Sequence, residues 1–523
     1  MNLLPAIIRD FNAKKWPTLE VSNFTKGEKL FLIAFYILDL AYSWNTFLSG
    51  PRAEMFGYPI IVPVILLLLK SRMFFMSFLI TFQITVAFLC IGNAEDMLKY
   101  TFAFTAAIIT ISNTDRGYYA AIISLFFFFL PRVQYYSIEH IIIFFLIVSL
   151  ITNTKLFFGY NRSNKLNMPL MILFLWINLS VFWSVSLRVV LESYFDIFSL
   201  FAIYWLTLII INEEEKIYKV LIIWAFCGFF YGFARSFFTP SDKELMGLFT
   251  AKNTVSSLLN YSIFCIMALI NLKKLKLHLL YLFLIILIPL SYVIGSKAGF
   301  ASLLIGIALY LILMDCNRKK RRRKLLKATS VLITLFLVAQ IPLVPLVYTK
   351  LKHIPLPIEM PMELQTIFFR FEQWEIGEQM LTEESNYYLG TGIYGYATLY
   401  SEFYSEDTKP KPWQNHPHSL YMYVFFDYGV VGLILFILMM VIFYWILTVF
   451  LLRSKNEPIR AVVFMVYIAT LSFLVHALVD WALIDKRFWF FLGLGIAAIL
   501  VDRNSGHPIR EMQDDTKDAL NKL

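Results

Sequence analysis

Two histidines are the residues of this 523-residue chain best suited to acid–base chemistry. His416 and His418 lie two positions apart in Asn415-His416-Pro417-His418-Ser419-Leu420. An imidazole exchanges a proton near neutral pH, so either histidine can act as a general base toward a hydroxyl group. The pair could also bind a metal ion, but the nearby Glu406 and Asp407 show no recognisable ligand spacing. We therefore favour a general base, and we predict neither a metal ion nor a cofactor.

Basic residues are the second group with a chemical use. Lys252 precedes Asn253 at an expected helix start, where the helix N-terminus adds its own positive end. Lys297 lies in the small-residue turn Gly295-Ser296-Lys297-Ala298-Gly299. Arg and Lys gathered on one side of a membrane suit phosphate binding, although each one alone also suits snorkelling to lipid headgroups. The basic residues expected on the external side of the membrane are Arg52, Lys99, Arg132, Arg188, Arg235, Lys243, Lys252, Lys297 and Arg370.

The composition identifies the surroundings of these groups. Hydrophobic residues make up 59% of the chain and charged residues only 16%, whereas soluble domains carry about 25% charged residues. This is the composition of a membrane protein. The net charge of +10 comes from basic residues in short loops between apolar runs, where they set orientation. We therefore exclude nucleic acid as a partner and expect membrane lipids to be one.

The apolar runs predict an all-α polytopic membrane protein. A membrane-spanning helix needs about 20 mostly apolar residues, and we expect about 14 spans, within a range of about 12 to 16. The candidate spans are 29–49, 56–70, 73–92, 100–113, 118–131, 138–153, 168–187, 190–211, 217–238, 253–272, 278–294, 298–315, 326–348, 430–452, 460–482 and 488–502.

The distribution of Lys and Arg predicts the orientation of these spans. About two thirds of these residues fall on the side that includes both termini, which places that side in the cytoplasm. The strongest contribution is the basic run 318–324. The expected organisation is a cytoplasmic segment 1–28, membrane helices 29–348, a large external loop 349–429 with the candidate histidine, membrane helices 430–502 and a cytoplasmic tail 503–523.

The large loop has recognisable parts. Apolar residues recur near helical spacing over 363–385, which predicts an amphipathic helix. A Gly-rich turn follows at 390–395 and an acidic stretch at 402–411, and residues 418–428 are typical of an interfacial helix that enters the next span. A loop of this length in a compact membrane protein is usually functional.

The loop and the span after it resemble the signature region of the O-antigen ligase and polymerase superfamily. The family pattern is a His followed by Asn, Ser or Gln, then nine residues, then Gly-x-x-Gly. His418, Ser419, Gly429 and Gly432 fit this count, whereas His416 would put Pro417 in the second position. The residues that carry the resemblance are Arg370, Trp374, 389–396, 415–419, Gly429 and Gly432.

Two upstream segments extend the resemblance, which covers about residues 168–450. Residues 247–253 are similar to a family loop that precedes a helix. Residues 295–299 are similar to a Ser-Arg-Gly turn, with Lys297 in place of the usual Arg; this keeps the charge but loses the planar fork of the guanidinium group.

The resemblance implies a metal-independent, inverting glycosyltransferase at the periplasmic face of the bacterial inner membrane. The donor would be a glycan on undecaprenyl diphosphate, and the acceptor a hydroxyl of a lipid A-core sugar. His418 and Arg370 would be the catalytic residues. The diphosphate would be bound by Lys252, Lys297, Arg235 and Arg188.

Other functions remain open at this point. A polymerase that joins lipid-linked repeat units shares the fold and the histidine loop, and the His-Ser spacing favours the ligase over it. Ligases that glycosylate proteins are a further variant. A flippase or transporter has a similar composition but is expected to show internal repeats and charges at the bilayer midplane, whereas the candidate charges here cluster at one side. A structural membrane subunit would leave the match around His418 unexplained.

Overall fold

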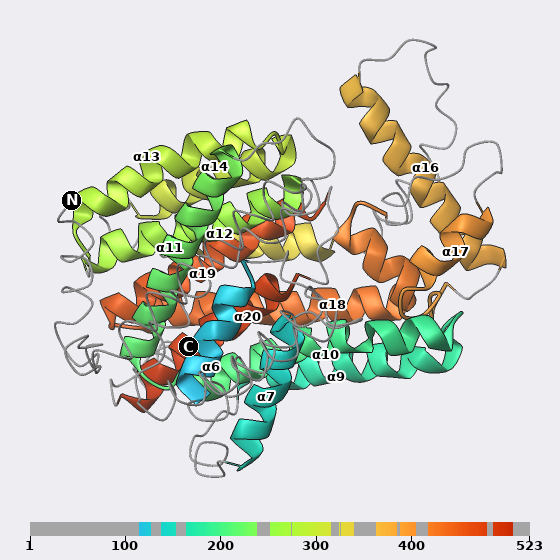
Figure 1. Cartoon of the computed structure of the whole chain (residues 1–523), viewed down its shortest axis with the longest axis horizontal. Coiled ribbons are helices and arrows are strands. Elements are labelled where there is room, and N and C mark those ends of the chain that lie inside the picture. The colour runs from blue at the N-terminus through green and yellow to red at the C-terminus, as the bar shows by residue number, and fades with distance from the viewer. Residues whose placement is uncertain are drawn as a thin grey trace, which may run out of the picture. The chain divides into compact units, whose positions relative to one another are not determined.

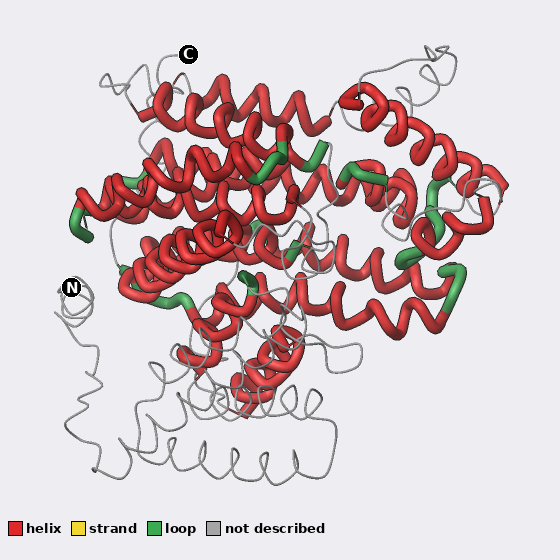
Figure 2. The backbone as a smooth tube through the Cα atoms, turned by 45° about the horizontal axis from the view of Figure 1, so that its top comes forward, coloured by secondary structure: helices red, strands yellow, loops and turns green. Residues whose placement is uncertain are grey.

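The computed structural model is all-helical over the residues that it describes. These are 114–126, 138–152, 164–237, 252–273, 275–314, 324, 326–338, 362–383, 387–403, 417–478 and 485–505. Figure 2 shows helices joined by short loops, with no strand among these residues. The all-α class is therefore confirmed. The expected spans between 29 and 113, most of the acidic stretch 402–411, and His416 lie outside the described residues.

The described helices agree with the apolar runs of the sequence from residue 114 onward. They are α6 (Thr114–Ser124), α7 (Ile138–Thr152), α9 (Asn167–Leu179), the 3-10 helix η3 (Ser180–Trp183), α10 (Leu187–Ile210), α11 (Glu214–Phe237), α12 (Lys252–Leu272), α13 (Leu277–Val293), α14 (Lys297–Met314), α16 (Met362–Glu383), α17 (Gly395–Phe403), α18 (Leu420–Arg453), α19 (Glu457–His476) and α20 (Lys486–Asn504). Figure 1 shows their arrangement within each unit.

Among the described residues, four helices are long and apolar enough to cross a membrane. They are α10, α12, α18 and α19. Shorter apolar helices lie at Asn167–Trp183, Leu277–Val293, Lys297–Leu313 and Leu326–Val338. These findings support a membrane protein. The expected count of about 14 spans is not confirmed and stays a prediction.

The chain divides into two compact units, and the first comprises Met1–Gly159 and Lys219–Gly295. Its described core centres on Trp224, whose ring lies 4.5 Å from that of Phe126 and 5.9 Å from that of Tyr261. Gly228 lies directly against Ser262 of α12. A small residue at such a contact lets two helix backbones approach closely, which is the usual way in which membrane helices pack.

The second unit comprises Tyr160–Tyr218 and Ser296–Leu523, and it contains the candidate histidine. In it α10 packs on α20, α20 on α19, α19 on α14, and α9 on α18. Phe201 of α10 contacts Trp489 of α20 at a ring distance of 4.8 Å, and Phe473 of α19 stacks on Phe488 at 4.7 Å. These aromatic contacts join the three helices into one core.

Helices α16 and α17 belong to the expected large loop 349–429. They lie together beside the first turns of α18 (Figure 1). A helix is present over most of the range expected at 363–385, as α16, and over most of 418–428, as the first part of α18. The amphipathic character of the first and the interfacial position of the second stay predictions. The helical backbone geometry of α18 is interrupted only at Gly429, which has φ 67° and ψ −173°. The chain therefore turns at Gly429 before the long apolar part of α18 begins.

Candidate active site at the start of α18

His418 occupies an unusual backbone conformation directly before α18. Its φ is 46°, in the left-handed region, which few residues other than glycine adopt. Pro417 and Ser419 on either side are buried, while His418 itself is partly exposed. Non-glycine residues held in this region are concentrated at functional sites, because the surrounding structure must over-determine them. The left-handed backbone at the half-buried His418 therefore marks this segment as a candidate functional site.

Two hydrogen bonds from different helices fix this segment. The indole Nε1 of Trp374 in α16 donates to the carbonyl oxygen of Pro417 at 2.6 Å. The backbone N–H of Leu420 donates to the carbonyl oxygen of Ala477, directly after α19, at 2.9 Å. His418 is thus held between α16 and the end of α19.

Arg370 reaches the same region from α16. It lies four residues before Trp374, so both side chains project from one face of the helix. The bond from Trp374 to Pro417 therefore places the helix of Arg370 beside the segment that carries His418.

The turn before α17 replaces the hydrogen bonds that α18 loses at Gly429. Instead of bonding to the next turn of α18, the carbonyl oxygens of Phe426 and Asp427 accept from the backbone N–H groups of Thr391 and Gly392, both at 2.8 Å. On the other side of the kink, the N–H of Val430 donates to the Tyr387 carbonyl at 3.0 Å. Buried backbone groups need such partners, so the turn and the kink require each other.

The kink at Gly429 and the turn 387–392 that bonds to it form a joint between α18 and α17. Tryptophans from α9 and η3 also bond to this joint. Trp176 donates from Nε1 to the Tyr428 carbonyl at 3.0 Å, and Trp183 donates to the Leu389 carbonyl at 3.1 Å. These bonds attach both the kink and the turn to the start of the second unit. The indole groups thus satisfy carbonyl oxygens that no helix partner reaches.

The glycines of the family pattern have a structural role here. A Cβ atom at Gly429 would lie 2.2 Å from the Tyr388 carbonyl oxygen, and one at Gly390 would lie 2.5 Å from the Asp427 carbonyl oxygen. Both residues also have positive φ, which glycine adopts without steric cost. Gly432 lies against Tyr428 and the Trp176 ring. The Gly-x-x-Gly part of the pattern therefore builds the joint between the turn and α18.

Asp427 links α18 to α17. It is fully buried, and its Oδ1 accepts from the backbone N–H of Tyr396 at 3.0 Å and from the Thr391 hydroxyl at 3.4 Å. A carboxylate at this place satisfies a donor at the N-terminus of α17 and complements the positive end of that helix. The hydroxyl of Tyr396 in turn donates to the Gln373 carbonyl of α16 at 2.9 Å.

Aromatic packing and one tyrosine hydroxyl add to this frame. Phe426 stacks on Tyr396 with ring centroids 5.3 Å apart, and its ring fills the space beside Gly377 of α16. Burial and the Glu378 carboxylate raise the pKa of Tyr387 to about 12, so its hydroxyl stays protonated and donates to Glu378 at 3.0 Å. The three helices α16, α17 and α18 are thereby locked together around the segment that carries His418.

Lys297 lies at the same end of the second unit as His476. On α14 and α19, Ser472 donates to the Ser302 carbonyl at 2.8 Å, and Tyr310 contacts Phe464 at 5.2 Å. These contacts progress in opposite directions along the two helices, so the helices are antiparallel. The first residue of α14, the exposed Lys297, is therefore level with the end of α19.

The other predicted diphosphate ligands lie on three different helices. Arg188 is exposed in the first turn of α10, just after Ser184, whose hydroxyl donates to the Ile393 carbonyl at 3.2 Å. Lys252 is the exposed first residue of α12, and Arg235 lies in α11. Both belong to the first unit. A role for Lys252 and Arg235 in donor binding stays a prediction.

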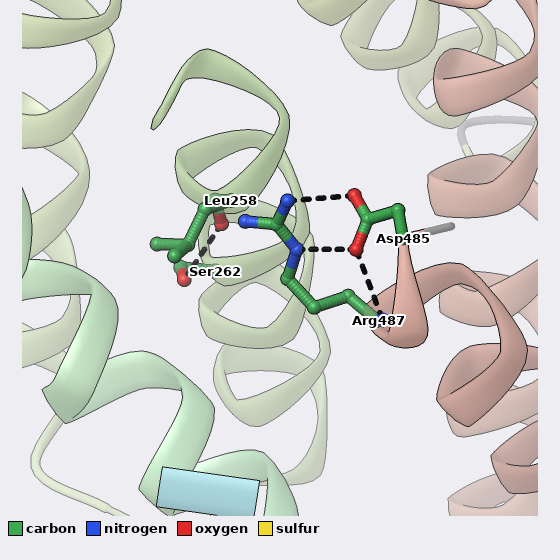
Figure 3. Close-up of polar contacts among 4 residues, drawn as sticks. All are labelled: Leu258, Ser262, Asp485 and Arg487. Carbon is green, nitrogen blue, oxygen red and sulfur yellow. Dashed lines mark hydrogen bonds and ion pairs between the residues drawn. The ribbon is translucent and has the colours of Figure 1, made fainter. Parts of the chain in front are cut away.

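Charged residues at the start of α20 form a group that the sequence analysis missed. Arg487 is 2% exposed and binds Asp485 through two bonds, Nε to Oδ1 at 2.5 Å and Nη2 to Oδ2 at 2.7 Å (Figure 3). Lys486 forms an ion pair with Asp196 of α10 at 3.5 Å. The signal in the sequence is a triplet of charges, Asp485-Lys486-Arg487, directly before the apolar run of α20. Such charges in a membrane protein are costly to bury and are often functional.

The described part of the chain contains no candidate metal site. No group of three or more His, Cys, Asp or Glu side chains there is arranged to hold a metal ion. His416 is not among the described residues, so the histidine pair as a metal ligand is not tested.

Fold and site together define an all-helical membrane protein with an imidazole and a guanidinium group at one end of its helices. Residues 279–437 match the family model described as O-antigen ligase. This match confirms the resemblance over residues 279–437. It includes Lys297, Arg370 and His418, and it supports a membrane enzyme of the type that acts on lipid-linked glycans. A comparison with curated proteins found no match.

Proposed function

We propose that this protein is an O-antigen ligase. It transfers a glycan from undecaprenyl diphosphate to a hydroxyl group of a lipid A-core sugar, at the periplasmic face of the inner membrane. The observation that carries the proposal is the bond from Trp374 to Pro417, because it joins the helix of Arg370 to the segment of His418. The family match over residues 279–437 supports the substrate class.

In the proposed reaction His418 takes the proton of the acceptor hydroxyl as its oxygen attacks the anomeric carbon of the donor glycan. A new C–O bond forms while the bond from that carbon to the diphosphate breaks, and the electron pair leaves with undecaprenyl diphosphate. One displacement of this kind inverts the anomeric configuration. Arg370 stabilises the negative charge that develops on the leaving diphosphate.

The donor-binding groups follow from the same chemistry. Lys297 and Arg188 lie in the second unit with His418, and we assign them, with Lys252 and Arg235, to the diphosphate. The lipid-linked donor already contains the activated bond, so no nucleotide is consumed. The reaction as proposed uses cationic side chains in place of a metal ion, and activity in the presence of a chelator tests this directly.

A polymerase is the second candidate, because it uses the same donor and the same histidine loop. The two activities leave different products when the gene is deleted. Loss of a ligase leaves full-length glycan on the lipid carrier and bare lipid A-core. Loss of a polymerase leaves single repeat units attached to lipid A-core. The second pattern would replace the ligase by the polymerase.

A further inference from the structure

The elbow between α9 and α10 carries exposed apolar side chains. We define the elbow as Ser180–Ser186, which comprises η3 and the turn after it. Phe182 is 86% exposed, the highest fraction among the exposed large apolar side chains of the described residues, and Val185 and Leu187 are exposed beside it. No residue from 180 to 187 carries a charge. Apolar residues gathered on a surface in this way mark a place of interaction.

The elbow continues the outer face of α9. The inner face of this helix carries the buried Leu170, Leu173 and Ile177, and α9 packs on α18. Exposed apolar residues recur along α9 every three to four residues, which is the period of a helix. They are Met168, Met171, Ile172, Leu175 and Leu179, and Phe182 follows at the same spacing. One apolar surface therefore runs from the start of α9 into the elbow.

The two helices form an antiparallel hairpin with the elbow at its closed end. Near the elbow, the Tyr194 hydroxyl donates to the side-chain oxygen of Asn178 at 2.7 Å. At the open end, the Tyr204 hydroxyl donates to the side-chain oxygen of Asn167 at 3.1 Å. Figure 1 shows α9 and α10 side by side. The elbow is therefore as far from the open end as the two helices are long.

The lengths of the two helices place the elbow in the bilayer. Charged residues bound the open end of the hairpin, Lys165 before α9 and 213–215 after α10. From that end, α9 with η3 extends for about 25 Å, and the 24 residues of α10 extend for about 36 Å. The hydrocarbon core of a bilayer is about 30 Å thick, or about 40–45 Å with the headgroups. Both helices therefore bring the elbow close to the far edge of the hydrocarbon core, and neither carries it clear of the headgroups.

The elbow is bonded to the joint between α17 and α18. Trp183 donates from Nε1 to the Leu389 carbonyl at 3.1 Å, and the Ser184 hydroxyl donates to the Ile393 carbonyl at 3.2 Å. Tyr388, directly before Leu389, is 66% exposed. Because these bonds link the two segments directly, the depth of the elbow in the membrane sets the depth of the joint.

We propose that the elbow is a membrane-surface contact, embedded at the boundary between the headgroups and the acyl chains, and that it holds the joint at this depth. Lipid fits this surface because the surface is apolar, uncharged and continuous with the outer face of a membrane helix. Tryptophan is enriched at this boundary, and Trp176 and Trp183 lie partly exposed with their rings 5.4 Å apart. The proposal concerns depth in the membrane and does not rest on the ligase reaction.

A depth measurement in a bilayer tests this proposal. A nitroxide spin label is attached at F182C of the full-length protein without native cysteines, in vesicles of phosphatidylethanolamine and phosphatidylglycerol. Oxygen collects among the acyl chains and a nickel chelate stays in water, so the ratio of the two collision rates reports depth. We expect this ratio to be several-fold higher at 182 than at K455C, the matched control. Lys455 is also exposed in a turn between two apolar helices, α18 and α19, but charged residues flank it in the sequence.

Three further positions test the parts of the proposal separately. L438C, on the exposed side of the apolar part of α18, should give the highest ratio. V185C reports on the elbow with Phe182 in place, which covers the case in which F182C fails to fold. Y388C should give a ratio close to that at 182, because the turn and the elbow are bonded together. A lipid-like ratio at 182 and 185 with a water-like ratio at 388 would refute the link between the elbow and the joint.

Other occupants of the elbow give other results. A ratio at 182 and 185 equal to that at 455 would place the elbow in water and overturn the proposal. Little collision with either reagent would mean that protein covers the elbow, and spin–spin broadening would identify that protein as a second copy; either result would also overturn it. The measurements need neither donor nor acceptor. A failed depth prediction therefore leaves the ligase proposal as it stands, and an absence of glycan transfer leaves the depth prediction intact.

Discussion

Trp374 and Pro417 are joined by a hydrogen bond of 2.6 Å from the indole nitrogen to the carbonyl oxygen. The bond connects α16 to the residue directly before His418, which lies 43 residues after Trp374 in the chain. Arg370 lies one turn earlier on the same face of α16. The position of the proposed base relative to the proposed cation therefore depends on this indole.

The substitution Trp374→Phe tests that dependence. It keeps an aromatic ring and removes the donor, so stability should change by only about 0.5–1.5 kcal/mol. Glycan transfer should fall by about tenfold or more, because small displacements of reacting groups are expensive. Turnover of the purified protein with lipid-linked donor is the measurement. Trp445→Phe on the exposed side of α18 is the control, and an equal loss in both variants would argue against a positioning role.

Substitution of Arg370 should lower the rate of glycan transfer more than Trp374→Phe does. Arg370→Ala should cost about 2–4 kcal/mol of transition-state stabilisation if the side chain contacts the developing charge. Arg370→Lys should recover only part of the rate, since Lys cannot form the paired bonds of the planar fork. The rate constants are compared at saturating donor. Wild-type turnover of Arg370→Ala would remove this residue from the mechanism.

Asp427 should matter for stability through α17. In Asp427→Ala the buried N–H of Tyr396 loses its acceptor, which costs about 1–3 kcal/mol. Asp427→Asn keeps an oxygen at the Oδ1 position and should be milder. Thermal unfolding of the purified protein in detergent ranks the two variants. Equal stability of Asp427→Ala and the wild type would mean that the joint between the turn and α18 does not depend on this carboxylate.

Much of the helical architecture could be predicted because apolar runs are long and regular in a membrane protein. The helix α16 and the helical start of α18 were also visible in the sequence. The kink at Gly429 was not, since its backbone partners come from Tyr387 and Thr391, some 40 residues earlier by chain order, and no local pattern records such a pairing. The spacing of the family pattern identified Gly429 and Gly432 but not their structural role.

The candidate site was predicted in part for a similar reason. His418 and Arg370 lie in one loop with a recognisable pattern, so the sequence could connect them. His476 and Arg487 belong to separate helices, α19 and α20, which pack on each other. A lone histidine at a helix end and a charge before an apolar run have ordinary explanations in sequence alone.

The orientation of the chain is tested by labelling. Single cysteines at Ser405 and Arg322, in a background without the native cysteines, report the side of each position in intact cells. An impermeant reagent should label position 405 and not 322, because the basic run 318–324 is expected in the cytoplasm. The opposite pattern would invert the topology and remove the active site from the periplasmic face.

The most direct test of the account is the transfer rate of His418→Ala beside that of His416→Ala. A general base supplies about 10²–10⁴-fold, so purified His418→Ala should insert and fold yet lose most transfer from the lipid-linked donor. His416→Ala should be milder, and chelator should leave the wild-type rate unchanged. If His418→Ala matched the wild type while His416→Ala did not, or if chelator abolished transfer, His418 would not be the base and a metal-dependent mechanism would take its place.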